Sequence, residues 1–254
     1  MIRVKRIFCA FPIGIRNFRI KVIKSCECEM IVTIDGPAGS GKSSVARQIA
    51  NKLNWIYLDT GATYRCAALL AHQAGIDASC AEKIADCLKS SKISFEYDSG
   101  DVRVFLDSQD VTDKIRSEEI SELASKLATN CKIRSALVEK QRQIASQYPN
   151  VITEGRDQGS VVFKDAELKI YMNANPRERA NRRYRQLKEQ GYDADYEQIL
   201  QAIIERDNRD KTRRISPLVV PEDAIVIDTT DLTIEQVVEQ IINLIEQRRK
   251  ESKR

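Results

Sequence analysis

The sequence has little of what metalloenzymes, membrane proteins and aromatic-rich binding surfaces depend on. Its one histidine, His72, lies in an apolar stretch, so a metal site or catalytic triad built on several histidines is excluded. We expect this residue to be a structural or surface histidine on a helix. Aromatic residues make up 6% of the chain, and no run approaches the roughly 20 apolar residues of a membrane span. We therefore expect no membrane association.

Cysteine spacing typical of metal sites or disulfide frameworks is also lacking. The seven cysteines are an odd number, and Cys66, Cys80, Cys87 and Cys131 show no CxxC spacing. This usage is typical of a reducing compartment, and we expect a cytoplasmic protein. We interpret these four thiols as buried side chains.

The chain lacks a concentrated basic surface beyond its first 29 residues. Those residues carry a net charge of +5, so residues 30–254 carry −1 of the overall +4. Proteins that bind nucleic acid usually present a clustered basic face, and we therefore expect a small anionic ligand and no nucleic acid. The segment 1–29 is basic but poor in Ser and has no unbroken apolar core, as targeting signals would require. We interpret it as a disordered tail or a mis-assigned start, which places the folded domain at residues 30–254.

Strand and helix patterns alternate from Met30 onward. MIVTID is a short β-branched run, and SVARQIANKL has the spacing of a helix. Four further short apolar strands are predicted at Trp55–Leu58, Val151–Thr153, Leu168–Met172 and Ala224–Ile227. With 42% hydrophobic residues, this alternation predicts an α/β fold with a central, parallel five-stranded sheet and helices on both faces.

Three segments depart from this simple alternation. KISFEYDSGDVRVFLDSQDVT alternates apolar and polar residues on either side of Ser99-Gly100-Asp101, which predicts an antiparallel hairpin in an inserted lobe. Glu118–Gln147 and Pro176–Arg206 are predicted to be helical, the second interrupted at Gln190-Gly191-Tyr192.

A phosphate-binding loop follows the first predicted strand. The run GPAGSGKS matches the pattern GxxxxGK[ST] and lies between a strand and a helix. Its glycines let backbone N–H groups turn toward phosphates, and the start of the helix adds its positive end. Lys42 is expected to reach the β- and γ-phosphates and Ser43 to ligate Mg²⁺. The predicted ATP-binding residues are Gly36, Pro37, Ala38, Gly39, Ser40, Gly41, Lys42, Ser43 and Ser44.

Charged residues follow two further strands. Asp59-Thr60-Gly61-Ala62-Thr63-Tyr64-Arg65 comes after the second strand, and Glu154-Gly155-Arg156-Asp157-Gln158-Gly159-Ser160 after the third. Ligands of open parallel sheets bind beyond the carboxyl ends of the strands, so both segments reach the rim that holds the phosphate loop. They suit an anionic substrate with polar edges, although surface ion pairs would explain either one alone.

A third charged segment lies near the C-terminal side. If it is helical, Arg206, Arg209, Asp210 and Arg213 share one face. The face is either a solvated ion-pair stripe or a set of cations that neutralise charge during phosphoryl transfer.

Four motifs now form a recognisable series. In order and spacing, GPAGSGKSS, LDTGATYR, ITEGRDQGSVVF and ERDNRDKTR resemble those of bacterial-type cytidylate kinases, from Met30 to about Glu246. The resemblance implies a monomeric nucleoside monophosphate kinase that transfers the γ-phosphoryl group of ATP to CMP and dCMP. It also implies a monophosphate-binding lobe at about residues 60–135, enlarged by the hairpin, and a mobile lid at about 177–192.

The resemblance also implies roles for single residues. The CMP phosphate would be held by three arginines, Arg65, Arg156 and Arg206. The cytosine would be surrounded by Thr60, Ser125, Arg134 and Asp157. Asp210 would face the ribose, and Arg213 would join Arg206 and Lys42 over the transferred phosphoryl group. The chain departs from many relatives in having Thr60 in place of Ser, and its phosphate loop ends Lys-Ser-Ser.

Other functions remain open at this point. The phosphate loop also suits a kinase for UMP, AMP or a shikimate-like acceptor. A regulatory GTPase would usually need an NKxD element, whereas the pair Asn51-Lys52 is followed by Leu53-Asn54. A binding module without catalysis would leave Lys42 and the arginines without a common purpose.

Overall fold

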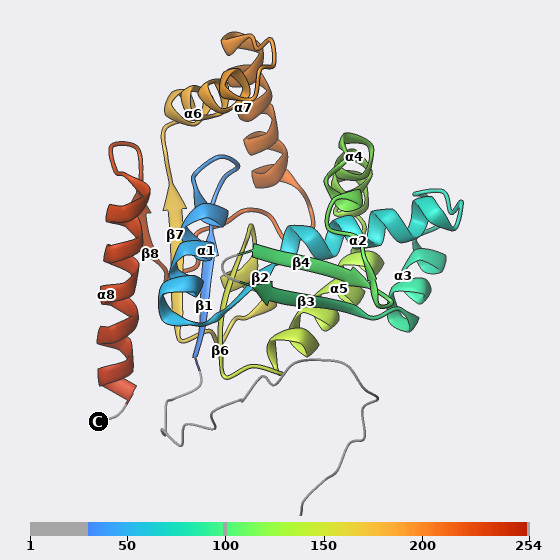
Figure 1. Ribbon diagram of the computed structural model, residues 1–254, viewed down its shortest axis with the longest axis horizontal. Helices are drawn as coiled ribbons and strands as arrows, with labels where there is room; N and C mark the ends of the chain where they lie inside the picture. The colour runs from blue at the N-terminus through green and yellow to red at the C-terminus, as the bar shows by residue number, and fades with distance from the viewer. Residues whose placement is uncertain (1–29, 99–100, 253–254) are drawn as a thin grey trace, which may run out of the picture.

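A five-stranded parallel sheet organises the protein. The computed structural model describes residues 30–98 and 101–252, and its main sheet has the strand order β2-β6-β1-β7-β8 (Figure 1). Its strands are β1 (Met30–Asp35), β2 (Ile56–Asp59), β6 (Asn150–Gly155), β7 (Leu168–Asn173) and β8 (Ile225–Asp228). All four strand pairings are parallel, which confirms the predicted α/β fold.

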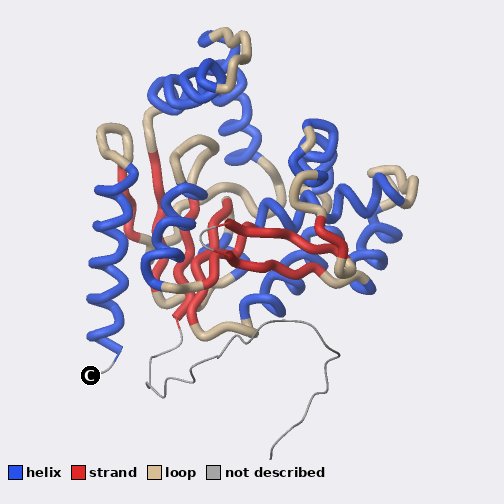
Figure 2. The backbone as a smooth tube through the Cα atoms, in the orientation of Figure 1, coloured by secondary structure: helices blue, strands red, loops and turns tan. Residues whose placement is uncertain are grey.

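Helices cover both faces of this sheet (Figure 2). On one face, α1 (Lys42–Leu53) and α8 (Ile234–Ser252) pack over a hydrophobic core that includes Val32 and Ile34 of β1. The second core contacts the opposite face through Ile31 and Val151 and is built largely from the helices between β2 and β6. Neighbouring residues of one strand thus serve different cores, as the twofold period of a strand requires.

The helices on the second side precede β6 in the chain. They are α2 (Thr60–Gln73), α3 (Ala81–Ser90), α4 (Glu118–Leu127) and α5 (Cys131–Ala145). Helices α6 (Pro176–Glu189) and α7 (Tyr196–Thr212) pack on each other above the carboxyl ends of the strands (Figure 1). The rim of the sheet, which is formed by the carboxyl ends of its strands, therefore faces the α6–α7 pair.

A small antiparallel sheet forms the predicted insert. It has the order β3-β4-β5, with β3 (Ile93–Asp98), β4 (Asp101–Leu106) and β5 (Gln109–Asp110), and a short 3-10 helix η1 (Lys114–Arg116) follows it. In the register of the hairpin, Phe95 lies opposite Val104. The pairing confirms the antiparallel hairpin, while residues 99–100 of its expected turn lie outside the described residues, as does the segment 1–29.

The segment Glu118–Gln147 is helical over most of its length, as predicted, but it is divided. The chain forms α4 and α5, separated by residues 128–130. Asn130 ends the interruption, since its side chain accepts hydrogen bonds from the backbone N–H groups of Lys132 and Ile133 at 3.0 and 3.5 Å. A side chain that caps a helix in this way starts a new axis, and here it places Arg134 in the first turn of α5.

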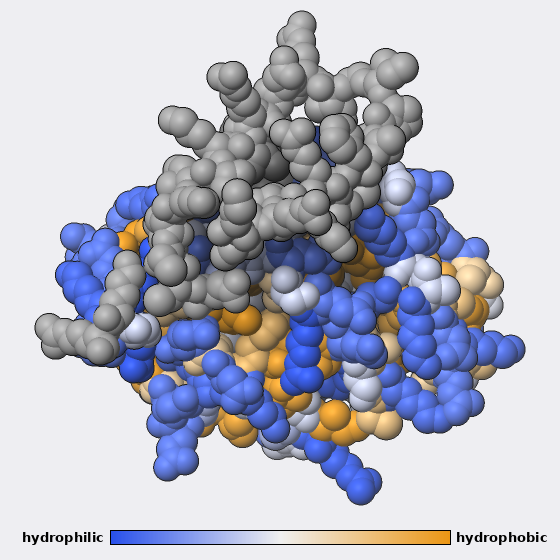
Figure 3. Space-filling view, turned by 90° about the horizontal axis from the view of Figure 1, so that it is seen from below, coloured by the Kyte–Doolittle hydropathy of each residue, from blue (hydrophilic) through white to orange (hydrophobic). Residues whose placement is uncertain are grey.

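The thiols and the histidine are placed by these helices. Cys66 is buried, whereas Cys80 and Cys87 are half-buried and Cys131 is exposed, so the expectation of burial is right for the first alone. His72 is exposed on α2, with Nδ1 3.4 Å from a carboxylate oxygen of Glu119, as expected for a surface histidine. Hydrophilic side chains also project around hydrophobic patches on the face seen from below (Figure 3). In the described ranges, no helix has the length and apolar character to cross a membrane.

Candidate active site

The phosphate loop connects β1 to α1 by a tight turn. Gly36 has a φ of 149°, and a Cβ atom there would lie 2.0 Å from the carbonyl oxygen of Met172 on β7, so a larger residue does not fit. Gly39 and Gly41 have φ values of 75° and 91°, in the left-handed region that favours glycine. The glycines of the motif thus allow the close turn that a phosphate-binding loop needs.

Lys42 is buried at the start of α1. Its ammonium donates a hydrogen bond to the carbonyl oxygen of Pro37 at 2.7 Å and lies 3.4 Å from Oγ of Ser40. Burial, together with the neighbouring cation of Arg156, lowers the pKa of Lys42 to about 7. The ammonium is therefore held by neutral oxygen atoms in a place where an anion would stabilise its charge.

Ser43 faces a buried carboxylate. Its hydroxyl donates to Oε1 of Glu154 at 2.9 Å, and the hydroxyl of Tyr57 lies 3.3 Å from the same oxygen. Glu154 stands near the end of β6, which pairs with β1. Hydroxyl and carboxylate oxygens are the ligands that Mg²⁺ prefers, and P-loop proteins commonly combine a loop Ser/Thr with an acid after a neighbouring strand. The two residues therefore fit a Mg²⁺ site, and only Ser43 was predicted for it.

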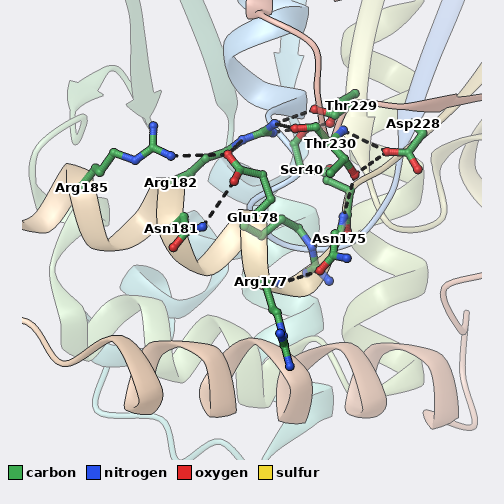
Figure 4. A network of polar contacts seen from close by, with 12 residues as sticks. Ser40, Asn175, Arg177, Glu178, Asn181, Arg182, Arg185, Asp228, Thr229 and Thr230 are labelled. Carbon is green, nitrogen blue, oxygen red and sulfur yellow. Dashed lines mark hydrogen bonds and ion pairs between the residues drawn. The ribbon is translucent and has the colours of Figure 1, made fainter.

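A pocket of about 870 Å³ opens beside the loop. It is lined by the loop and α1, by α6, and by the segment 229–234 that follows β8. Arg182 of α6 spans it, donating to the carbonyl oxygens of Thr229 and Thr230 at 2.5 and 3.1 Å and to Glu178 at 3.2 Å (Figure 4). The pocket is large enough for a nucleotide and is rich in hydrogen-bonding groups.

Arg179 connects the phosphate loop to α6 and α7. This fully buried side chain of α6 donates to the carbonyl oxygen of Ala38 at 2.9 Å and to both carboxylate oxygens of Asp207 on α7 at 3.2 and 2.6 Å. The sequence reasoning missed this pair because its two charges are 28 positions apart. An Arg and an Asp inside two arginine-rich helices carried no signal that they would be buried together.

On the other side of the rim, Arg134 and Asp157 form a buried ion pair, each with 4% of its surface exposed. Arg134 also donates to the carbonyl oxygen of Ala128 at 3.0 Å and lies over the ring of Tyr64, 5.5 Å from its centre. The two residues that the resemblance assigns to the base are thus brought together from α5 and the loop after β6.

Next to this pair, Asp210 connects two arginines. Nε of Arg156 donates to Asp210 at 2.8 Å, and Nη1 of Arg213 lies 3.9 Å from the same carboxylate. Nη2 of Arg213 is buried without a hydrogen-bond partner, and the side chain of Arg206 makes no hydrogen bond or ion pair with any described residue. These N–H groups are available to an anion.

The other predicted residues are placed differently. Arg65 pairs with Asp59 at 3.2 Å at the start of α2. The hydroxyl of Thr60 donates to the backbone carbonyl oxygen of Glu154 at 2.7 Å. Ser125 is exposed on α4 and, within the part of the chain that the structure describes, has no side-chain hydrogen bond. The structure therefore does not join Ser125 to the other residues of the predicted set.

Asp35 is a buried carboxylate at this rim that sequence reasoning missed. It ends β1 directly before Gly36, and only 1% of its surface is exposed. Its position between a strand and the phosphate loop was the one available signal, because its partners lie more than a hundred residues away, in the loop after β6.

The fold and the site together define a class of protein. A phosphate loop with a buried lysine, opposite arginines that include unpaired N–H groups, at the carboxyl edge of a parallel sheet, is the arrangement of a P-loop phosphotransferase.

Comparison with known proteins identifies the family within this class. The family model for cytidylate kinase matches residues 32–247. Cytidylate kinase from Caldicellulosiruptor saccharolyticus is 45% identical over 213 residues, which cover 84% of this chain and 94% of that protein. Cytidylate kinase from Aeromonas salmonicida is 42% identical over 217 residues, which cover 85% and 94%. The chain belongs to the cytidylate kinase family.

Solved structures are similar at a greater distance. Shikimate kinase from Acinetobacter baumannii in complex with shikimate is 17% identical, covers 87% of this chain and 95% of its own, and has a TM-score of 0.43. This likeness is too distant to say anything about the acceptor.

Proposed function

We propose that this protein transfers the γ-phosphoryl group of ATP to CMP and dCMP, with Mg²⁺ as cofactor. The observation that carries the choice of acceptor is the buried pair of Arg134 and Asp157 beside the arginines of the rim. A shikimate-like acceptor has no base and would leave this pair without a role, whereas cytosine has complementary groups.

The acceptor would be held by hydrogen bonds and charge. Cytosine offers an amino donor beside a ring nitrogen and a carbonyl that accept, so Asp157 would accept from the amino group and Arg134 donate to the acceptors. Asp210, near the ribose hydroxyls, can accept from them. The CMP phosphate would be bound by the cations of Arg65, Arg156 and Arg206. Thr60 and Ser125 remain proposed neighbours of the base by family resemblance.

The chemistry is a direct displacement. A phosphate oxygen of CMP attacks the γ-phosphorus of ATP, and the bond to the oxygen that bridges the β- and γ-phosphates breaks, giving CDP and ADP. Positioning and neutralisation of charge are the main catalytic contributions in such reactions. Lys42 would leave the carbonyl of Pro37 for the phosphates, and Arg206 and Arg213 would face the moving group.

Ser43 and Glu154 would hold Mg²⁺, Ser43 directly. The ion, when bound, neutralises phosphate charge as it develops. The residues around it would orient the donor phosphates. The remaining residues of the set Gly36–Ser44 would supply backbone N–H groups, except Pro37, which has none.

The organisation of the enzyme belongs to the same proposal. Residues 60–135 would form the monophosphate-binding lobe and residues 177–192, which include most of α6, the lid. We also propose that the protein acts as a cytoplasmic monomer.

Steady-state production of ADP, measured with Mg²⁺ and each of CMP, dCMP, UMP, AMP and shikimate, tests the proposal. We expect the highest kcat/KM with CMP and dCMP and a lower value with UMP. Absence of stimulation by both cytidine nucleotides would overturn the assignment.

A further inference from the structure

Asp35 bonds the loop after β6 to β1, the strand that leads into the phosphate loop. Its two carboxylate oxygens accept separate hydrogen bonds from the backbone N–H groups of Gln158 at 2.8 Å and Gly159 at 2.7 Å. Hydrogen bonds from N–H groups to a carboxylate are among the stronger ones in proteins. One side chain of β1 therefore fixes the segment that directly follows Asp157.

These two N–H groups belong to a helical end. Gln158 and Gly159 begin η2 (Gln158–Val162), a π-helical turn in which the N–H of Val162 bonds to the carbonyl of Asp157 at 3.1 Å. Amide groups at a helix start lack partners within the helix and are normally capped by the side chain of the preceding residue.

Asp157 stands in that capping position but does not cap the turn. Its side chain makes no hydrogen bond to the start of η2 and is instead paired with Arg134. An aspartate is among the best capping residues, so its own carboxylate would compete for the amide of Gly159, two residues further on, if that amide were free. Asp35 occupies the amides and thereby removes the competition.

The contact surface leaves little room for rearrangement. A Cβ atom on Gly159 would lie 2.8 Å from Oγ1 of Thr33, so the turn packs closely against β1. Gln158 is also buried, and its side chain accepts a hydrogen bond from Thr153 at 3.1 Å. The position of the turn is thus set from two strands.

We propose that Asp35 is a positioning residue for recognition of the acceptor base. By capping η2 in place of Asp157, it leaves the carboxylate of Asp157 free to pair with Arg134 and with the base. The inference rests on the proposed CMP kinase activity and deepens it, because it extends base selection to a residue that does not itself contact the base.

The two hydrogen bonds from η2 stabilise the charged form of Asp35. Burial is the main cause that raises the pKa of Asp35, and the charge of Asp157 adds to it. The hydrogen bonds from Gly159 and Gln158 and the charge of Lys42 oppose this rise, and the resulting pKa is about 6. An Asn at this position keeps one accepting oxygen and directs an amino group at the other N–H. One amide of η2 then loses its partner, and Asp157 becomes the nearest alternative acceptor in the chain sequence.

A double-mutant cycle tests the proposal. The variants Asp35→Asn, Asp157→Asn and the double variant are compared with the wild type by kcat/KM for CMP and for UMP. In the wild-type background we expect Asp35→Asn to lower kcat/KM for CMP roughly tenfold or more, the scale of a lost charge-assisted hydrogen bond, and to narrow the CMP/UMP ratio. When Asp157→Asn is already present, adding Asp35→Asn should leave the CMP/UMP ratio of kcat/KM unchanged.

A loss that is equal for CMP and UMP, or a change in ratio of the same size in both backgrounds, would make Asp35 merely structural and overturn the inference. Asp77→Asn is the matched control, because Asp77 accepts a backbone N–H from Ser79 at 2.8 Å but is exposed. If Asp35→Asn does not fold, Asp35→Ser carries the same cycle, since a serine hydroxyl can accept one amide. Failure of the wild type to phosphorylate CMP would instead count against the proposed function.

Discussion

The two sides of the rim hold their cations in different ways. The donor side is the phosphate loop with the pocket beside α6, and the acceptor side is the group around Asp157 and Asp210. On the donor side, Lys42 donates to the backbone carbonyl oxygen of Pro37. Arg182 donates to the carbonyl oxygens of Thr229 and Thr230, with Glu178 of its own helix as a further partner. A carbonyl is a neutral partner, whereas a phosphate oxygen adds the attraction of opposite charges to its hydrogen bond with the same cation. Lys42 can therefore exchange its internal partners for the phosphates of ATP without leaving a charge unpaired.

On the acceptor side the partners are carboxylates. Arg134 is paired with Asp157, and Arg156 with Asp210. A ligand that offered only negative charge would attract the arginines but leave two carboxylates unpaired. This is costly above all for Asp157, which is buried, whereas Asp210 is half-buried. Cytidine nucleotides also carry hydrogen-bond donors, the amino group and the ribose hydroxyls, that can satisfy carboxylates. The comparison indicates that the donor side selects charge, whereas the acceptor side selects a pattern of donors and acceptors.

Breaking the donor side should have the largest effect. We expect Lys42→Ala to lower kcat by about a hundredfold or more, because a cation that stabilises developing phosphate charge is lost. The melting temperature should fall little, since the ammonium has no carboxylate partner in its hydrogen bonds. Lys52→Ala, at an exposed position in the last turn of the same helix, is the control. Near-normal turnover of Lys42→Ala would refute the role of the loop.

Breaking the acceptor side should change selectivity. Uracil has a carbonyl where cytosine has its amino group, so a charged Asp157 would face an acceptor and remain unpaired. Asp157→Asn can donate from its amide, and we expect it to lower kcat/KM for CMP more than for UMP, narrowing their ratio by about tenfold. The measurement is kcat/KM for both nucleotides, with the exposed Asp165→Asn as control. A parallel fall in both values would mean that Asp157 supports only the loop or Arg156.

The pH dependence of stability sharpens the comparison. Because burial lowers the pKa of Lys42 to about 7, the unfolded chain binds one proton more than the folded protein between about pH 7 and the ordinary lysine value of 10.5. Stability of the ligand-free wild type should therefore rise with pH in this interval, by at most about 1.4 kcal/mol per pH unit. Lys42→Met lacks this contribution.

Urea unfolding of both proteins at pH 6.5 and pH 9 measures the effect. The stability advantage of Lys42→Met should be largest at pH 6.5 and shrink as the pH rises. A difference that does not depend on pH would mean that the ammonium is well compensated in the folded protein.

Local patterns predicted much of this molecule. The strand–loop–helix unit at Met30, the five strands and the hairpin follow from periodicity and glycine placement within short windows, and the structure confirms them. The break before α5 was missed because one side chain, that of Asn130, outweighs a helical pattern that continues on both sides.

Long-range partners could not be predicted in this way. Asp35 bonds to amides 123 and 124 positions away, and Arg179 meets Asp207 only when α6 and α7 pack together. For Arg134 and Asp157, family resemblance supplied what spacing alone could not. Sequence patterns thus located the rim, but the internal partners of its charges depend on how the elements meet.

The smallest effect is expected from removing residues 1–29, which precede the start of β1 at the end of the sheet opposite the rim. A chain that starts at Met30 should retain the turnover and melting temperature of the full chain. Met30 is the first residue of β1, where it pairs with Asn150, and its N–H donates to the carbonyl of Pro149 at 2.9 Å, so the strand is complete from this residue. The catalytic groups proposed here lie at and beyond the other end of that strand. Melting temperature and kcat with CMP are measured for both proteins at equal ionic strength, since the first 29 residues carry +5 charges and could act on an anionic substrate at long range. Equal melting temperatures and equal kcat values would show that residues 30–254 supply both the donor side and the acceptor side of the site. A lower melting temperature of the shorter chain would show that residues 1–29 stabilise the fold, and a raised KM alone would show that their charge assists binding.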